Sequence, residues 1–181
     1  MSIEKTLDSR IIYEGKIIKV RVDRVLLPNN REATREVVEH PGAVSVIPIK
    51  DGNVIFVKQF RKPVEEELLE IPAGKLEKGE DINECVKREL QEETGYIAEN
   101  IRYITSFYTS PGFSNEIMHL FVAENLKKTV ANTDEDEFIE IEEIPIGSIS
   151  DIIKMGKIKD SKTLIGLLYY FYFVGGKIEN L

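Results

Sequence analysis

Residues 81–94 combine an apolar face and an acidic face at the spacing of a single helix. Ile82, Val86 and Leu90 recur every four residues, which places them on one side of an α-helix. Gly95 follows at once, and glycine often ends helices because it accepts a left-handed backbone conformation. The pattern predicts a helix over residues 81–94 that buries its apolar side.

The same segment carries three glutamates that a helix would bring together. Glu89 and Glu93 are four residues apart, and Glu92 flanks the same face. Like charges at these spacings destabilise a helix unless they are neutralised. A hard divalent cation neutralises them, because Mg²⁺ prefers carboxylate oxygens. The alternative is a solvated acidic face, since surface helices are often rich in Glu.

The loop before this helix, residues 73–80, contains two glycines and can therefore fold tightly. Such a turn can direct the carbonyl of Ala73 toward a metal ion. Arg88 on the helix can pair with Glu80 and hold the loop in place. Loop and helix are thus expected to form one site.

Composition narrows the class of protein. The chain has 181 residues, of which 42% are apolar, which is enough for one domain or one domain with an appendage. The net charge of -8 argues against nucleic-acid binding. The single cysteine, Cys85, cannot form an intramolecular disulfide and is expected to be packed. With no signal-like start and no apolar run of membrane-spanning length, a cytoplasmic protein without a membrane partner is predicted.

The order of expected elements indicates an α+β (mixed α/β) fold, because strands and helices do not alternate as βαβ units. The first third is predicted to form strands, with a turn at residues 28–30. A boundary near residue 41 divides an N-terminal β region, residues 1–41, from a main domain, residues 42–181. In the main domain, strands are expected at residues 43–49, 54–60, 67–71, 101–108, 117–123 and 138–141, and helices at 81–94, 149–155 and 162–173.

Residues 74–96 resemble the Nudix box, a pattern of Gly, five residues, Glu, seven residues, then Arg-Glu-apolar-any-Glu-Glu-any-Gly-apolar. All seven fixed positions match, and Tyr96 replaces the usual aliphatic residue at the end, which is expected to alter packing only. In this sequence the pattern reads Gly74, Glu80, Arg88, Glu89, Leu90, Glu92, Glu93, Gly95 and Tyr96. The resemblance implies an α/β/α sandwich with the N-terminal strands as an antiparallel appendage.

The resemblance also implies roles for these residues. Glu89, Glu92, Glu93 and the Ala73 carbonyl would hold Mg²⁺, with Mn²⁺ as an alternative, and Glu92 would also be catalytic. The metals would bridge two phosphates and activate a water. Four box residues would serve the structure: Gly74, Glu80, Arg88 and Gly95.

Two further segments look like the ADP-ribose pyrophosphatase subgroup of this family. Pro111 and Gly112 follow Gly95 at the distance seen there, although an ordinary turn has the same composition. Arg61 and Glu70 precede the box as they do in that subgroup, and the resemblance implies that both bind substrate together with Pro111 and Gly112. Arg61 would contact phosphate with a planar, bidentate geometry, or would simply be solvated at the end of a strand.

By the same resemblance, the N-terminal strands would form a homodimer and Arg35 would reach the partner's site, although three other arginines of this region compete with it. The acidic residues 133–137 lie where related enzymes carry a catalytic loop. Glu135 would be the general base and Glu137 a transient metal ligand, with Glu116 as a further candidate acid. A solvated acidic loop is the alternative.

The resulting prediction is a Mg²⁺-dependent homodimeric hydrolase that splits ADP-ribose into AMP and ribose 5-phosphate. One alternative is a pyrophosphatase for another nucleoside diphosphate sugar. An enzyme that removes oxidised nucleoside triphosphates and a non-catalytic nucleotide-sugar-binding regulator are further alternatives. His40 and His119 lack the spacing of metal ligands, and the aromatic residues 169–173 are expected in a helix core.

Overall fold

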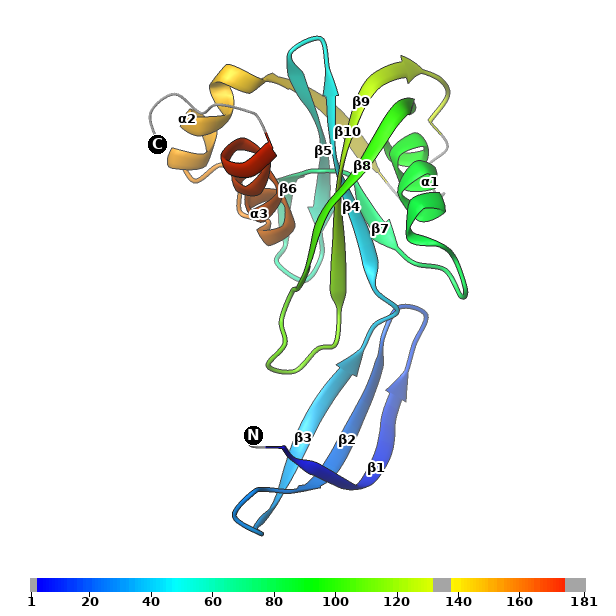
Figure 1. Cartoon of the computed structure of the whole chain (residues 1–181), viewed down its shortest axis with the longest axis vertical. Helices are drawn as coiled ribbons and strands as arrows, with labels where there is room; N and C mark the ends of the chain where they lie inside the picture. The colour runs from blue at the N-terminus through cyan, green and yellow to red at the C-terminus, as the bar shows by residue number, and fades with distance from the viewer. Residues whose placement is uncertain (1–2, 132–137, 175–181) are drawn as a thin grey trace. The chain divides into compact units, whose positions relative to one another are not determined.

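The computed structural model describes residues 3–131 and 138–174. The chain forms two compact units. One comprises Met1–Gly42 with Tyr108–Ile117, and the other comprises Ala43–Phe107 with Met118–Leu181. Figure 1 shows the elements of both units.

The first unit contains a three-stranded antiparallel sheet in the order β1-β2-β3. The strands are β1 (Lys5–Glu14), β2 (Lys19–Leu26) and β3 (Glu32–Glu39). The expected turn at residues 28–30 is confirmed: Asn30 has a φ of 62°, and the Leu27 amide donates to the Arg31 carbonyl at 2.8 Å. Every residue of β1 is exposed, so this edge strand contributes no side chain to a hydrophobic core.

A segment from the middle of the chain, Tyr108–Ile117, belongs to this unit. The Val38 amide donates to the Phe113 carbonyl at 2.7 Å, and the Asn115 amide donates to the Val38 carbonyl at 3.2 Å. The His40 amide also donates to Oδ1 of Asn115 at 2.8 Å. These bonds attach the segment that contains Pro111 to the end of β3.

The second unit is built on a seven-stranded mixed sheet with the order β10-β5-β4-β9-β8, in which β6 pairs with β5 and β7 pairs with β4. Its central pair, β4 and β9, runs parallel, with Val44 opposite His119. The strands are β4 (Ala43–Lys50), β5 (Asn53–Arg61), β6 (Glu66–Glu70), β7 (Ala73–Lys75), β8 (Tyr96–Tyr108), β9 (Ile117–Lys128) and β10 (Ile139–Pro145).

Helices cover both faces of this sheet, as the predicted α/β/α sandwich requires (Figure 1). Helix α1 (Ile82–Thr94) lies on one face, and α2 (Ile149–Lys154) with α3 (Ser161–Tyr169) lies on the other. Neighbouring residues of β4 therefore point to different cores. Val46 packs in the cluster that includes Leu90 of α1, and Ile47 packs in the cluster that includes Leu167 of α3.

Several of the expected boundaries were wrong. Strands β9 and β10 run on to Lys128 and Pro145, beyond the predicted ends at residues 123 and 141. Strand β8 begins at Tyr96, directly after Gly95, and not at residue 101. The last helix leaves α geometry at Tyr169 and continues as a π-helical turn, Tyr170–Val174. Tyr170 and Phe171 are buried there, whereas Tyr172 and Phe173 are exposed, so the aromatic run is only partly core. Within residues 3–131 and 138–174, no helix has the length and apolar character needed to cross a membrane.

Candidate active site

Helix α1 is held at both ends by local signals. Asp81 caps its start, because its side chain accepts from the Asn83 amide at 2.8 Å. Gly95 ends it in the left-handed conformation, with φ 67°. Val86 and Leu90 are fully buried against the sheet. This anchoring fixes the direction in which the acidic face of the helix points.

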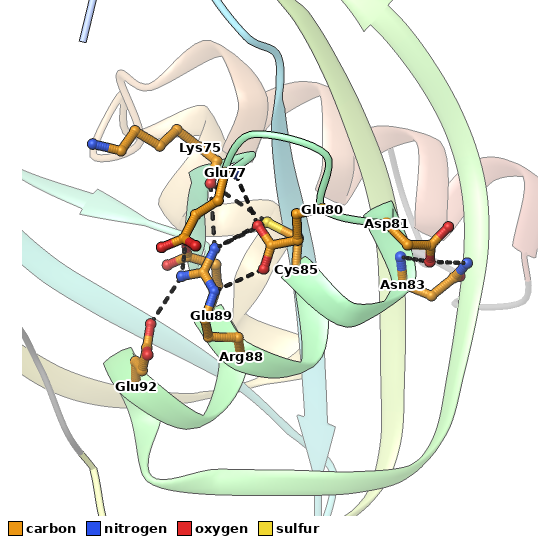
Figure 2. Close-up of polar contacts among 9 residues, drawn as sticks. All are labelled: Lys75, Glu77, Glu80, Asp81, Asn83, Cys85, Arg88, Glu89 and Glu92. Atoms are coloured by element: carbon orange, nitrogen blue, oxygen red, sulfur yellow. Dashed lines mark hydrogen bonds and ion pairs between the residues drawn. The ribbon is translucent and has the colours of Figure 1, made fainter. Parts of the chain in front are cut away.

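Arg88 ties the preceding loop to the helix, as Figure 2 shows. Its Nε and Nη2 donate to the two carboxylate oxygens of Glu80, each at 2.9 Å. Its Nη1 donates to Glu89 at 2.7 Å and to Glu92 at 3.0 Å. The predicted Arg88–Glu80 pair is therefore confirmed, and the same guanidinium also neutralises two neighbouring carboxylates.

This clamp shifts the ionisation of its members. Its hydrogen bond to Glu80 raises the pKa of Arg88 above the usual arginine value. The Arg88 guanidinium in turn lowers the pKa of Glu80 to about 2, although partial burial of the carboxyl works the other way. Cys85, fully buried below the clamp, donates weakly to the Lys75 carbonyl at 3.5 Å. Burial raises the pKa of its thiol to about 12, so Cys85 is packed and is not a thiolate nucleophile.

The carboxylate of Glu89 lies directly against the backbone of Gly74. A β-carbon built at Gly74 would be 1.9 Å from Cδ of Glu89 and 2.0 Å from its Oε1. No side chain fits in that space, so residue 74 must be glycine for Glu89 to keep its place. The requirement for this glycine comes from the carboxylate and not from a positive φ.

Glu93 is the most enclosed of the three helix glutamates, with 4% of its surface exposed. Its Oε2 accepts from the Ala73 amide at 3.0 Å, which fastens the start of β7 to the end of α1. Glu89 and Glu92 are more open, with 12% and 33% of their side chains exposed. The three carboxylates thus form a graded series from buried to solvent-accessible.

These residues suit a hard divalent cation by donor type. Carboxylate oxygens are the ligands Mg²⁺ prefers, and Mg²⁺ keeps several of its waters. Among the residues that the structure describes, no group of three or more His, Cys, Asp or Glu is arranged so that it could hold a metal ion. Glu89, Glu92 and Glu93 therefore suit Mg²⁺ by donor type alone, and their role as metal ligands remains a prediction.

Arg61 ends β5 and is paired with a buried carboxylate. Its Nε and Nη2 each donate to Glu70 at 2.7 Å. Hydrogen bonding to Glu70 makes the largest contribution to the raised pKa of Arg61. The negative charge of Glu93 raises that pKa further. Glu70 is 1% exposed and sits at the end of β6, so the structure makes it the partner of Arg61. One edge of the guanidinium is therefore already engaged, and phosphate would have to use the edge that includes Nη1.

Comparison with known proteins agrees with this geometry. The model of the NUDIX domain matches residues 39–165. The chain belongs to the Nudix family. A second model, the nucleoside diphosphate sugar hydrolase N-terminal domain, matches residues 4–38.

Two relatives of this Nudix hydrolase match over 92% of its chain and 91% of their own. The methanol dehydrogenase activator of Bacillus methanolicus is 48% identical, and the ADP-ribose pyrophosphatase of Bacillus subtilis is 47% identical. The crystal structure of an ADP compounds hydrolase has the same fold, with a TM-score of 0.82 at 20% identity over 92% of this chain and 91% of that one.

The remaining predicted residues lie in the first unit or outside the described residues. Arg35 is exposed on β3 and pairs with Glu4, its Nε donating to Oε2 at 2.9 Å. Pro111 and Gly112 are exposed in the segment attached to β3. Glu135 and Glu137 fall in residues 132–137, outside the described residues. The roles given to these residues remain predictions.

Of the other polar residues considered, Glu116 accepts a hydrogen bond from Oγ1 of Thr109 at 2.6 Å and lies 3.7 Å from Nδ1 of His40. His119 packs beside Tyr103, and burial lowers its pKa. The sequence patterns did not indicate one buried residue that contacts Glu70. Lys162, buried at the start of α3, donates to Glu70.

Proposed function

We propose that this Nudix hydrolase cleaves the pyrophosphate bond of ADP-ribose to give AMP and ribose 5-phosphate, with Mg²⁺ as cofactor. The observation that carries the proposal is the complete carboxylate helix, in which Gly74 makes room for Glu89 and Arg88 holds the loop through Glu80. The substrate follows from the 47% identity to the ADP-ribose pyrophosphatase of Bacillus subtilis.

Glu89, Glu92 and Glu93 would hold the cation, together with the carbonyl of Ala73. When bound, the cation would neutralise charge on the phosphate oxygens and lower the pKa of a bound water. Nudix hydrolases generally use a divalent metal ion, which agrees with the oxygen donors of α1. Mn²⁺ prefers the same donors and would substitute.

The residues of the chain would divide the work around this cation. Glu92 would be catalytic as well as a metal ligand, and its side chain is the most exposed of the three carboxylates. Arg61 would bind the diphosphate through the edge that contains Nη1. Glu135 as general base and Glu137 as a transient ligand belong to this proposal as predictions from the family resemblance.

We further propose that the chain acts as a homodimer in the cytoplasm. Strand β1 exposes apolar side chains, among them Leu7, Ile11 and Tyr13, which a second sheet could cover. Arg35, Pro111 and Gly112 would then contribute to substrate binding as they are predicted to by resemblance. A monomer in light scattering would contradict the shared site.

A product assay with Mg²⁺ tests the proposed activity. The panel contains ADP-ribose, ADP-glucose, UDP-glucose, GDP-mannose, NADH and 8-oxo-dGTP, with products separated by chromatography. AMP and ribose 5-phosphate should appear from ADP-ribose well ahead of every other product. Faster turnover of another compound would identify that compound as the substrate and would leave the proposed pyrophosphate hydrolysis unchanged. No product from any compound would favour a non-catalytic regulator.

A second candidate function is activation of a methanol dehydrogenase. It is favoured by the 48% identity to a protein that is named for this role. Methanol oxidation by that dehydrogenase would be measured with and without this chain. A rise that the Glu93→Gln variant fails to give would make the hydrolase activity the cause of activation. No rise with the wild-type chain would reject this candidate.

A further inference from the structure

Four charged side chains meet where α3 packs against the ends of two strands. Arg61 ends β5, Glu70 ends β6, and Asp160 and Lys162 lie at the first turn of α3. Lys162 is 8% exposed and Glu70 is 1% exposed. Buried charges are costly unless each has a partner, so these groups must satisfy one another. Nothing in the proposed chemistry requires a buried lysine at this place.

The position of Lys162 is fixed by the cap of its own helix. Its Nζ donates to Oε2 of Glu70 and lies 3.1 Å from Oδ2 of Asp160. That Asp160 oxygen also accepts from the amide of Thr163 at 2.9 Å and from its hydroxyl at 2.6 Å. The Thr163 hydroxyl in turn accepts from the Ile71 amide at 2.9 Å. The ammonium is therefore held by the helix start, which is itself bonded to the strand.

Lys162 restricts how Glu70 can turn. Oε2 of Glu70 accepts from both Lys162 and Nη2 of Arg61, while Oε1 accepts from Nε of Arg61. Burial alone would raise the pKa of Glu70, but Arg61 and Lys162 outweigh it and lower the pKa. The carboxylate stays charged and cannot rotate without breaking a charge-assisted bond. Its plane sets the plane of the Arg61 guanidinium.

The orientation of Arg61 matters for the way in which its guanidinium would meet the substrate. Arg61 is joined to the carboxylate site through its partner, because Glu70 lies three residues before Ala73, whose amide donates to Glu93. The charge of Glu93 also raises the pKa of Arg61. The bonds of Arg61 to Glu70 use the edge formed by Nε and Nη2, and Nη1 takes part in neither of them. A guanidinium has five N–H donors, and the edge away from Glu70 can meet a diphosphate.

We propose that Lys162 is a positioning residue for diphosphate binding: it locks Glu70, which orients Arg61 toward the substrate. The inference rests on the proposed function, in which Arg61 binds the phosphates. It extends the site to α3, an element that contributes no metal ligand. Because Arg61 would bind ground state and transition state alike, loss of its orientation should appear in KM and much less in kcat.

Lys162→Met removes the ammonium and keeps most of the aliphatic stem. We expect KM for ADP-ribose to rise about tenfold with kcat changed less than about threefold. Lys162→Arg, which keeps a charged donor, should recover most of the loss. Lys159→Met is the matched control, because Lys159 lies just before α3 and pairs with Glu66 at the start of β6. Its KM should equal that of the wild type.

A double-mutant cycle separates positioning from structural support. In the Arg61→Met background, Lys162→Met should change KM by less than about twofold, because the oriented group is gone. Equal effects of Lys162→Met with and without Arg61 would overturn the proposal. An unchanged KM with a lowered melting temperature would also overturn it. If Lys162→Met does not fold, Lys162→Gln replaces it in the same cycle.

A measurement without substrate keeps this test independent of the proposed activity. The ¹⁵N–¹H resonance of Arg61 Nε is assigned by its absence in Arg61→Met. We expect its hydrogen exchange to be about tenfold faster in Lys162→Met than in the wild type and in Lys159→Met. Unchanged exchange would overturn the positioning role even if ADP-ribose is cleaved. Faster exchange in a protein that does not cleave ADP-ribose would reject ADP-ribose as the substrate. It would still support the role of Lys162 in positioning Arg61.

Discussion

Gly74 and Glu89 are packed so closely that a β-carbon at residue 74 would lie 1.9 Å from Cδ of Glu89. The contact joins the loop before α1 to a carboxylate on the helix. It explains why the Nudix box begins with a glycine, although the backbone at residue 74 does not have a positive φ. The glycine is needed for the position of a functional group, and substitution should therefore affect activity more than stability.

Gly74→Ala should lower kcat/KM for ADP-ribose about a hundredfold. The added methyl must displace the end of the flexible Glu89 side chain, and a shift of about 1 Å in a catalytic group can cost that factor. Gly147→Ala is the control, because a β-carbon at Gly147 meets no atom within 4 Å. Steady-state kinetics with urea unfolding would decide the point. Normal kinetics in Gly74→Ala would show that the carboxylate tolerates displacement.

Glu80 should make the stability of the fold depend on pH below neutrality. Its pKa is lowered from 4.5 to about 2 by Arg88, so its contribution is fully present above about pH 4.5 and is lost as the pH falls toward 2. Glu80→Gln should therefore be less stable than the wild type at pH 7, and the difference should shrink below pH 4.5. Urea unfolding at pH 7, 4.5 and 3 measures this.

The control for the pH experiment is Glu84→Gln. Glu84 pairs with Lys87 on the exposed side of α1, where 67% and 57% of the two side chains are open to solvent. Such pairs contribute little to stability. If the difference in unfolding free energy between the wild type and Glu80→Gln stays constant across this pH range, the assigned pair of Glu80 with Arg88 is contradicted.

Tyr96 ends the box with an aromatic residue, and the structure gives its hydroxyl a partner. The hydroxyl donates to Oε1 of Glu143 at 3.2 Å, and the residue is 7% exposed. Tyr96→Phe should lower the free energy of unfolding by about 1 kcal/mol, because it removes one hydrogen bond and little packing. Chemical denaturation with the Glu143→Gln variant as comparison measures it. An unchanged stability would mean that the hydroxyl is satisfied by water.

The carboxylate helix could be predicted from the sequence because its determinants are local. Apolar spacing, the cap at Asp81 and the distance from Glu80 to Arg88 all lie within one short segment. The burial of Glu93 could not be predicted from that spacing. It depends on the Ala73 amide, which tertiary packing of β7 brings to the end of the helix.

Lys162 shows where sequence reasoning reaches its limit. It contacts Glu70 across 92 residues, and no periodic pattern links the two positions. A lysine at the start of a helix is usually solvated, and only the packing of α3 against the sheet makes this one part of the site. The link between Val38 and Phe113 was missed for the same reason.

The oligomeric state provides a further test. Light scattering of the full chain should give a mass close to twice that of one protomer. Replacing Ile11 and Tyr13 of β1 by Ser should shift the chain toward the monomer, because both side chains are more than half exposed and apolar. Activity should fall with the dimer if each site is completed by the partner. An active monomer would contradict the shared site.

The most direct test of the central claim is the turnover of Glu93→Gln with ADP-ribose and Mg²⁺. The amide oxygen of Gln can still accept from the Ala73 amide, so the fold should be kept while the ligand charge is lost. We expect kcat to fall by about a thousandfold or more with little change in unfolding free energy. Near-normal turnover would contradict the assignment of α1 as the helix that binds the metal.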